Sequence, residues 1–329
     1  MDIKKNAKDI FSFLFRIALS LIILSLVFSK IDMDRTKAIL ASANIGLIMC
    51  SFSVFFFVNV AMLFRWFVFI RALNISVSIC AVVRNFFLGL FGNLFLPSSV
   101  GGDILKTFGL CKESANKTRV VASVLLDRLS GFAAIVIVSI CSFAFGYRYI
   151  GDTSLLVPIS LIAVGSLFVV LVLFNKRIYS FFCKVFNRFP NFKKSLMNLH
   201  YDITLLKDRK RQGLEAIGLS CLSQLVFAFA WYLIARALHQ DINLIYFLIF
   251  VPLTCVASSL PSIGGLGVRE AGAVYLFGKV GVAQGVAVSI SLITYFFMVL
   301  IGVIGGLFYV STLSSGRIQY YTPDACHTK

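Results

Sequence analysis

The apolar positions of this chain gather into long, nearly uninterrupted runs rather than into the one-faced or alternating patterns of water-soluble domains. A helix needs roughly 20 residues to cross the apolar core of a bilayer. Five runs reach that length clearly, and a sixth qualifies although it contains Gln224: 10–29, 45–69, 120–146, 154–174, 283–311 and, with the glutamine, 213–236. The pattern predicts an all-α integral membrane protein with about six full spans.

Two further apolar segments are too short or too broken to span. Phe86–Leu96 has 11 residues, about 16 Å of helix, and Leu244–Ser258 contains Pro252. We expect the stretches 79–106 and 244–279 to enter the membrane and return on the same side, as two re-entrant helical hairpins. Four short spans in place of the two hairpins are the alternative.

Composition narrows the class of protein. Of the 329 residues, 59% are apolar and 14% are charged, against about 25% charged in an ordinary soluble domain. A water-facing surface cannot cover so much apolar side chain, which excludes a soluble globular enzyme, a disordered chain and a nucleic-acid-binding module. The net charge is +17. Most of the basic residues lie between the apolar runs, where they orient spans and contact anionic headgroups. We expect membrane lipids as partners and no nucleic acid; homo-oligomerisation is left open.

The basic residues also predict the orientation. The stretch 175–212 is the most basic of the chain, and an excess of Lys and Arg marks cytoplasmic loops. The lysines of residues 4–8 place the N-terminus on the same side, and counting spans puts the polar tail 312–329 there too. We therefore expect a multi-pass protein of the cytoplasmic (inner) cell membrane with both termini in the cytoplasm. The loop 30–44 is predicted to lie outside the cell although it is basic, which is a mild exception to the positive-inside rule.

No metal or cofactor site is expected. The eight cysteines include no C-x-x-C pair and the three histidines lie far apart, so the spacings typical of zinc sites are missing. The sequence contains no G-x-x-x-x-G-K-[ST] loop for nucleotide binding.

The most informative feature is an internal similarity between the two broken segments. Leu96–Lys106 (LPSSVGGDILK) resembles Leu260–Glu270 (LPSIGGLGVRE), with one residue fewer between Pro-Ser and Gly-Gly in the second copy. Each copy follows a short apolar arm and has a full span on either side. Our span count opens the first hairpin inward and the second outward, which is the inverted-topology repeat of many secondary transporters.

The residue types in these segments fit an anion site near the middle of the membrane. Proline ends the incoming arm, and the glycines permit a tight, irregular turn. The helix that restarts after each Gly-Gly points its N-terminus at the midplane, where free N–H groups and a partial positive charge favour an anion such as a phosphate. Lys106 and Arg269 lie close to these ends. A plain loop between two ordinary helices is the alternative.

Charged residues inside the predicted membrane region are costly and therefore informative. Asp127 and Arg128 lie eight residues into their span and, as neighbours on a helix, need separate partners. We expect these partners among Lys106, Arg269 and Glu270. A structural ion pair near the membrane interface is weighed equally.

Several other polar residues have a structural and a functional interpretation. Asp103 is expected to cap its own helix rather than to carry a proton, and Glu270 is the better candidate for coupling to protons. Asn93 is expected to bond freed backbone groups or a headgroup, and Arg65, near a span end, to snorkel. The candidate substrate-binding residues are Asn93, Pro97, Gly101, Gly102, Asp103, Lys106, Asp127, Arg128, Pro261, Gly264, Gly265, Gly267, Arg269 and Glu270.

These residues carry a family resemblance. The order N-x-x-x-P, G-G-D-x-x-K, D-R and P-x-x-G-G-x-G-x-R-E resembles the lysylphosphatidylglycerol synthase transmembrane family over essentially the whole chain. Members with synthase activity have an additional soluble C-terminal domain, which is not expected here, so the resemblance implies the lipid-translocating half alone. It implies a single flippase-like domain over 1–329: a first repeat of about 45–146, the basic linker 175–212, a second repeat of about 213–311 and the tail 312–329.

We expect a flippase that moves an anionic, aminoacylated or polyprenyl-phosphate lipid headgroup across the cytoplasmic membrane, and not an enzyme. The alternative is a membrane-embedded glycosyl- or phosphotransferase acting on a lipid phosphate. Its local support is the pair Asp32 and Asp34 after the first span, suited to general-base or metal-binding chemistry, although helix capping explains the pair more simply. A scaffold without transport is a third alternative, which the cost of charges in the broken arms disfavours.

Overall fold

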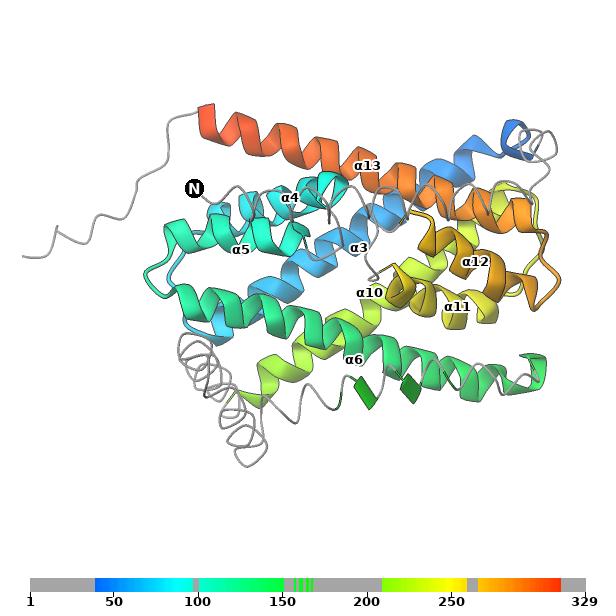
Figure 1. The fold of residues 1–329 in the computed structure, drawn as a ribbon, viewed down its shortest axis with the longest axis horizontal. Coiled ribbons are helices and arrows are strands. Elements are labelled where there is room, and N and C mark those ends of the chain that lie inside the picture. Colours follow the sequence, from blue (N-terminus) through cyan, green and yellow to red (C-terminus); the bar gives the residue numbers. More distant parts are fainter. Residues whose placement is uncertain are drawn as a thin grey trace, which may run out of the picture.

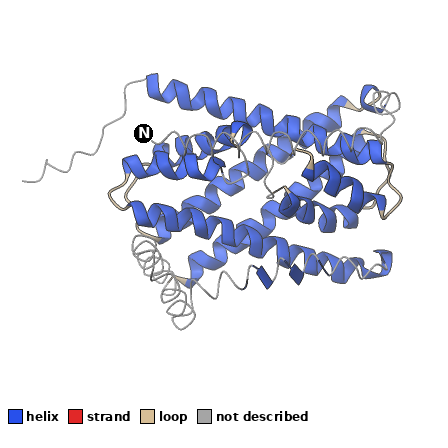
Figure 2. Cartoon of the chain, in the orientation of Figure 1, coloured by secondary structure: helices blue, strands red, loops and turns tan. Residues whose placement is uncertain are grey.

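The computed structural model describes residues 39–96, 101–150, 209–258 and 266–314, and six isolated positions between 157 and 167. These parts are helical and contain no strand (Figures 1 and 2). The helices are α3 (Ile45–Ala72), α4 (Ile79–Phe95), α5 (Gly101–Glu113), α6 (Lys117–Ile150), α10 (Lys210–Ala237), α11 (Leu244–Ala257), α12 (Val268–Gly278) and α13 (Gln284–Ser314). The predicted all-α membrane fold is confirmed.

In the part of the chain that the structure describes, four helices are long and apolar enough to cross a membrane: α3, α6, α10 and α13. They coincide with four of the predicted spans. The predicted span 10–29 lies outside the described residues, and only isolated positions of 154–174 are described. The total of six spans therefore stays a prediction.

The shorter helices form two pairs, α4 with α5 and α11 with α12, and the helices of each pair pack against each other. In Figure 1 the chain enters and leaves the α4–α5 pair at the left end of the molecule and the α11–α12 pair at the right end. The bends between the paired helices, residues 97–100 and 259–265, lie outside the described residues. Whether the pairs are re-entrant in a bilayer remains a prediction.

The two halves of the molecule make matching contacts. Helices α3 and α10 run antiparallel side by side: the Asn44 N–H donates to the Ala237 carbonyl (2.8 Å), and the Arg209 guanidinium donates to the Arg71 carbonyl (3.4 Å). Helix α4 of the first half packs on α13, just as α11 of the second half packs on α6. Exchanging the two halves therefore reproduces the helix contacts, with opposite ends of the molecule exchanged.

A second sequence repeat, absent from our sequence-based predictions, underlies this symmetry. Phe64–Asn74 (FRWFVFIRALN) and Phe229–His239 (FAWYLIARALH) share a Phe, a Trp and the ending Arg-Ala-Leu. Helices α3 and α10 end within these segments, and Asn74 (φ 51°) and His239 (φ 57°) follow them at matching positions. In the described part these are the two non-glycine residues with positive φ. The next helix begins after a matching cap in each half, Ser78 or Asn243, whose side chain accepts a backbone N–H of the first turn.

Two apolar cores each surround one tryptophan, and each draws most of its residues from one half. Trp66 lies in a cluster with residues such as Phe86 and Leu110, and Trp231 lies in a cluster with residues such as Phe250 and Phe277. Both indoles are almost fully buried. The outward faces of the long helices instead carry exposed apolar side chains, for example Phe57, Phe64, Leu214, Phe296 and Leu307, as helices that face lipid require.

Candidate functional site

The first half contains a buried network of charged side chains built around Asp127 of α6. Its carboxylate accepts from Arg65 Nε of α3 (2.6 Å) and lies 3.1 Å from Lys106 Nζ of α5. All three residues are at most 5% exposed. Because an unpaired charge in such a place costs several kcal/mol, each group depends on the others for compensation.

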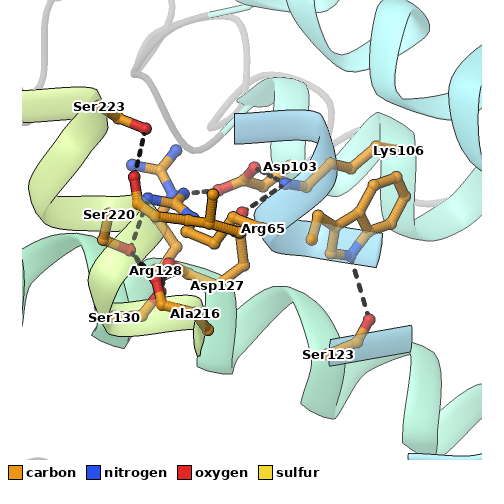
Figure 3. A network of polar contacts seen from close by, with 12 residues as sticks. Arg65, Asp103, Lys106, Ser123, Asp127, Arg128, Ser130, Ala216, Ser220 and Ser223 are labelled. Carbon is orange, nitrogen blue, oxygen red and sulfur yellow. Dashed lines mark hydrogen bonds and ion pairs between the residues drawn. The ribbon is translucent and has the colours of Figure 1, made fainter. Parts of the chain in front are cut away.

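The network continues from Lys106 to a second carboxylate. Lys106 Nζ lies 3.0 Å from Asp103 Oδ1, and Arg128 Nε donates to the other oxygen of Asp103. The side chains thus follow one another as a line of alternating charge, Arg65–Asp127–Lys106–Asp103–Arg128 (Figure 3). Three cations face two carboxylates, so these five side chains carry one excess positive charge.

Serine and aromatic side chains hold this network in place. Arg65 Nη1 donates to Ser220 Oγ of α10 (3.3 Å), which in turn bonds Ser130 Oγ of α6 (3.2 Å). Lys106 Nζ lies 4.9 Å from the centre of the Trp66 ring, a cation–π contact. The Trp66 indole N–H donates to Ser123 Oγ (3.2 Å). The network therefore ties α3, α5 and α6 of the first half to α10 of the second (Figure 3).

A close approach of α4 and α5 positions Lys106. Asn93 Oδ1 accepts the Gly102 N–H (3.0 Å), one of the free N–H groups that begin α5. A Cβ on Gly102 would collide with the Gly89 carbonyl and the Asn93 side chain, so only glycine permits this packing. Of the two expectations for Asn93, the structure shows the bond to a freed backbone group.

The second half contains a smaller network around Glu270. This carboxylate accepts from Arg269 Nη2 (2.6 Å), from Ser291 Oγ of α13 (2.8 Å) and from the Gly267 N–H (2.7 Å). Arg269 also donates to Ser291 (2.8 Å), and its guanidinium lies 5.4 Å from the centre of the Tyr295 ring. Glu270 is fully buried and Arg269 is 4% exposed. One cation faces one anion here, so the pair is neutral.

Gly267 should be intolerant of a side chain, because its φ of 85° lies in the left-handed region. We expect Gly267→Ala to lower the free energy of unfolding by about 1–3 kcal/mol. Gly278→Ala, in the same helix and with open space around the new Cβ, is the control and should cost much less. Thermal unfolding of the purified protein in detergent measures both, and equal losses would contradict the assignment.

The structure brings the predicted site residues together within each half. Asp103, Lys106, Asp127 and Arg128 share one network, and Gly267, Arg269 and Glu270 share the other. Gly101 is the first, buried residue of α5. Pro97, Pro261, Gly264 and Gly265, and the acidic pair Asp32 and Asp34, lie outside the described residues.

Three expectations need correction. Arg65 does not snorkel to the membrane surface but is 5% exposed and bonds Asp127. The expected choice of partners is right for Asp127, which meets Lys106, but Arg128 meets Asp103 rather than a residue of the three proposed. Asp103 lies in the first turn of α5, as expected, yet its carboxylate faces Lys106 and Arg128. Partners brought by other helices decide these side-chain positions.

Arg65 is the site residue that our sequence analysis missed as a member of the network. The signal was present in the repeat that ends α3 and α10, where Arg65 stands beside Trp66 and the other copy has Ala230 beside Trp231. A charged residue in one copy, where the other copy has an apolar residue, has a functional or pairing reason to be there. Among the described residues no group of His, Cys, Asp and Glu is arranged to hold a metal ion.

The long apolar helices and the buried charges define an all-helical membrane protein with an ionic site in its interior. The chain belongs to the family described as lysylphosphatidylglycerol synthase TM region, whose model matches residues 13–306; the resemblance seen in the sequence is confirmed. It is also similar to the UPF0104 membrane protein PH1989 of Pyrococcus horikoshii, with 24% identity over 289 residues that cover 79% of this chain and 85% of that protein. No solved structure matches the chain.

Proposed function

We propose that this protein is a flippase rather than an enzyme, and that it moves the anionic headgroup of a membrane lipid between the leaflets of the cytoplasmic membrane. The observation that carries the proposal is the ionic network Arg65–Asp127–Lys106–Asp103–Arg128, which is buried at one end and partly exposed at Arg128. It is surrounded by helices long and apolar enough to span a bilayer. Ionisable residues at such depth mark substrate pathways in membrane proteins.

The buried part of the network, Arg65, Asp127 and Lys106, is suited to a structural role. Its more exposed end, at Arg128, is suited to binding a ligand. Asp127 is held by two cations from different helices, which keeps Lys106 in place. Arg128 has a side chain that is 31% exposed, so an incoming phosphate can reach it. A guanidinium and an ammonium side by side offer the strong, charge-assisted hydrogen bonds that phosphates favour. The acyl or prenyl tails stay in lipid while the headgroup enters.

Movement of the headgroup uses the matched halves. Because the α4–α5 pair opens at one end of the molecule and the α11–α12 pair at the other (Figure 1), rocking of one half against the other along α3 and α10 exposes the site to each face in turn. No nucleotide-binding loop is present in the sequence, so the lipid gradient or an ion gradient supplies the driving force.

The orientation follows from the basic residues at one end of the molecule. The end of α3, the end of α5 and the beginnings of α6 and α10 meet there. They carry Arg71, Lys112, Lys117, Arg119, Arg209 and Arg211. By the positive-inside rule this end faces the cytoplasm, which places both termini on that side if the predicted count of spans holds.

Transport of a fluorescent phosphatidylglycerol in reconstituted vesicles tests the proposal. We expect the full-length protein to accelerate the loss of protection from an external quencher, and Lys106→Ala to reduce the rate at least about tenfold, because one buried charge-assisted contact is worth about 1.5–3 kcal/mol. Lys112→Ala removes a lysine from the exposed end of the same helix and should leave the rate unchanged.

Size-exclusion chromatography of each variant separates loss of transport from loss of folding. Lys106→Arg keeps the charge and should retain part of the rate. The proposal fails if the wild-type protein is no faster than empty vesicles for anionic headgroups, or if folded Lys106→Ala transports as well as the wild type.

A further inference from the structure

The five-residue network differs in exposure from one end to the other. The side chains of Arg65, Asp127 and Lys106 are 5–7% exposed, whereas those of Asp103 and Arg128 are 15% and 31% exposed. A ligand can therefore approach only the Asp103–Arg128 end of this line without first dismantling the buried part. That end is already occupied by a carboxylate of the protein itself.

The Asp103 carboxylate stands where a phosphate group would bind. One of its oxygens is 3.0 Å from Lys106 Nζ and the other accepts from Arg128 Nε. A phosphodiester also carries one negative charge and presents two unesterified oxygens, which two adjacent cations can bind in the same way. The carboxylate and the phosphodiester thus compete for the same pair of cations.

We infer that Asp103 is a resting counter-anion, which the phosphodiester of the lipid headgroup replaces at Arg128 and Lys106. The inference rests on the proposed function and adds a substrate class to it. Because the phosphodiester carries the same single negative charge as the Asp103 carboxylate, the exchange leaves the charge at the two cations unchanged. After the headgroup leaves, Asp103 returns to the two cations, so that the lipid is released rather than trapped.

The second half supports this assignment by contrast. Arg269 and Glu270 are both buried, and each is satisfied by the other and by Ser291. That pair has no excess charge and no partly exposed end. Ligand exchange therefore belongs to the first half, and the second pair acts as a fixed tie between α12 and α13.

Binding of a soluble short-chain lipid tests the exchange. Dihexanoyl phosphatidylglycerol, below its micelle concentration, is titrated against the full-length protein in phosphatidylcholine nanodiscs. The chain has two tryptophans, so a Trp231→Phe background leaves Trp66, 4.9 Å from Lys106 Nζ, as the fluorescent reporter. We expect Asp103→Asn to bind at least about tenfold more tightly than the parent, since an intramolecular competitor is removed, and to transport lipid more slowly because release is slowed.

Two matched variants make the result specific. Asp103→Glu restores a carboxylate and should return the affinity most of the way to that of the parent. Glu113→Gln removes one carboxylate from the other end of α5, where it pairs with Arg84, and should leave the affinity unchanged. Dihexanoyl phosphatidylcholine has the same phosphodiester but also a quaternary ammonium, which Lys106 and Arg128 repel, so it should bind far more weakly than the phosphatidylglycerol to every variant.

The outcomes separate the inference from the proposed function. If Asp103→Asn binds no tighter than the parent, or if Glu113→Gln tightens binding equally, the exchange by Asp103 is refuted while the flippase proposal stands. If neither the parent nor Asp103→Asn binds the anionic lipid, both the inference and the proposed ligand class are wrong. Tight binding without any transport in vesicles would refute the flippase alone.

Discussion

Replacing Asp127 with alanine is expected to lower the free energy of unfolding by about 3–5 kcal/mol, the usual effect of breaking a buried ion pair from one side. The reason is the position of this carboxylate between Arg65 and Lys106, both of which are 5% exposed. Without Asp127 two cations remain buried beside each other, and their repulsion adds to the cost of burial. Reversible unfolding in mixed detergent micelles, followed by tryptophan fluorescence, measures the loss.

Asp241→Ala is the matched control for this result. Asp241 also pairs with an arginine, Arg236, but its side chain is 96% exposed, and exposed pairs contribute only about 0–1 kcal/mol. A small loss in Asp127→Ala, comparable to that in Asp241→Ala, would mean that water reaches and solvates the network. A larger loss of stability in Asp127→Ala than in Asp241→Ala therefore tests the burial of the ion pair as well as its existence.

The second large effect is expected at the Arg269–Glu270 pair, where removal of both charges should be tolerated better than removal of either. Glu270→Leu leaves a guanidinium buried without its counter-charge, and Arg269→Met leaves a carboxylate that is fully buried. We expect each single variant to lose about 3–5 kcal/mol, and the double variant to lose at least about 2 kcal/mol less than the sum.

The double variant also separates stability from transport. Because the pair is proposed as a tie between α12 and α13 and not as a ligand site, the stable double variant should keep the affinity for dihexanoyl phosphatidylglycerol. Purely additive losses in the three unfolding curves would contradict the coupling of the two residues. Loss of binding in a folded double variant would contradict the division of roles between the halves.

The long helices could be predicted from the sequence because apolar runs of span length need no knowledge of tertiary partners. The four predicted runs that fall in the described part begin and end within a few residues of α3, α6, α10 and α13. Helix α4 was harder to delimit, since it begins at Ile79, well before the apolar segment from Phe86. Its early polar residues Arg84 and Asn85 are paired with Glu113 of α5, a contact that local pattern does not reveal.

The candidate site could be predicted in part. Its charged residues were identified because charge in an apolar environment is rare. Their pairing was harder to predict from the sequence, because Arg65 and Asp127 come from different helices. Only the packing of α3 against α6 selects this arginine over the others near span ends. Asp103 was judged by its position in a first helical turn, where capping is the usual role, but two nearby cations outweigh that local preference.

The antiparallel packing of α3 and α10 has an evolutionary consequence. Two copies of one ancestral half fit this arrangement when they lie in opposite orientations in the membrane. Within one chain the two copies are free to differ, and Arg65 and Ala230, at matching positions of otherwise similar helix ends, mark a place where one half carries a charge and the other does not.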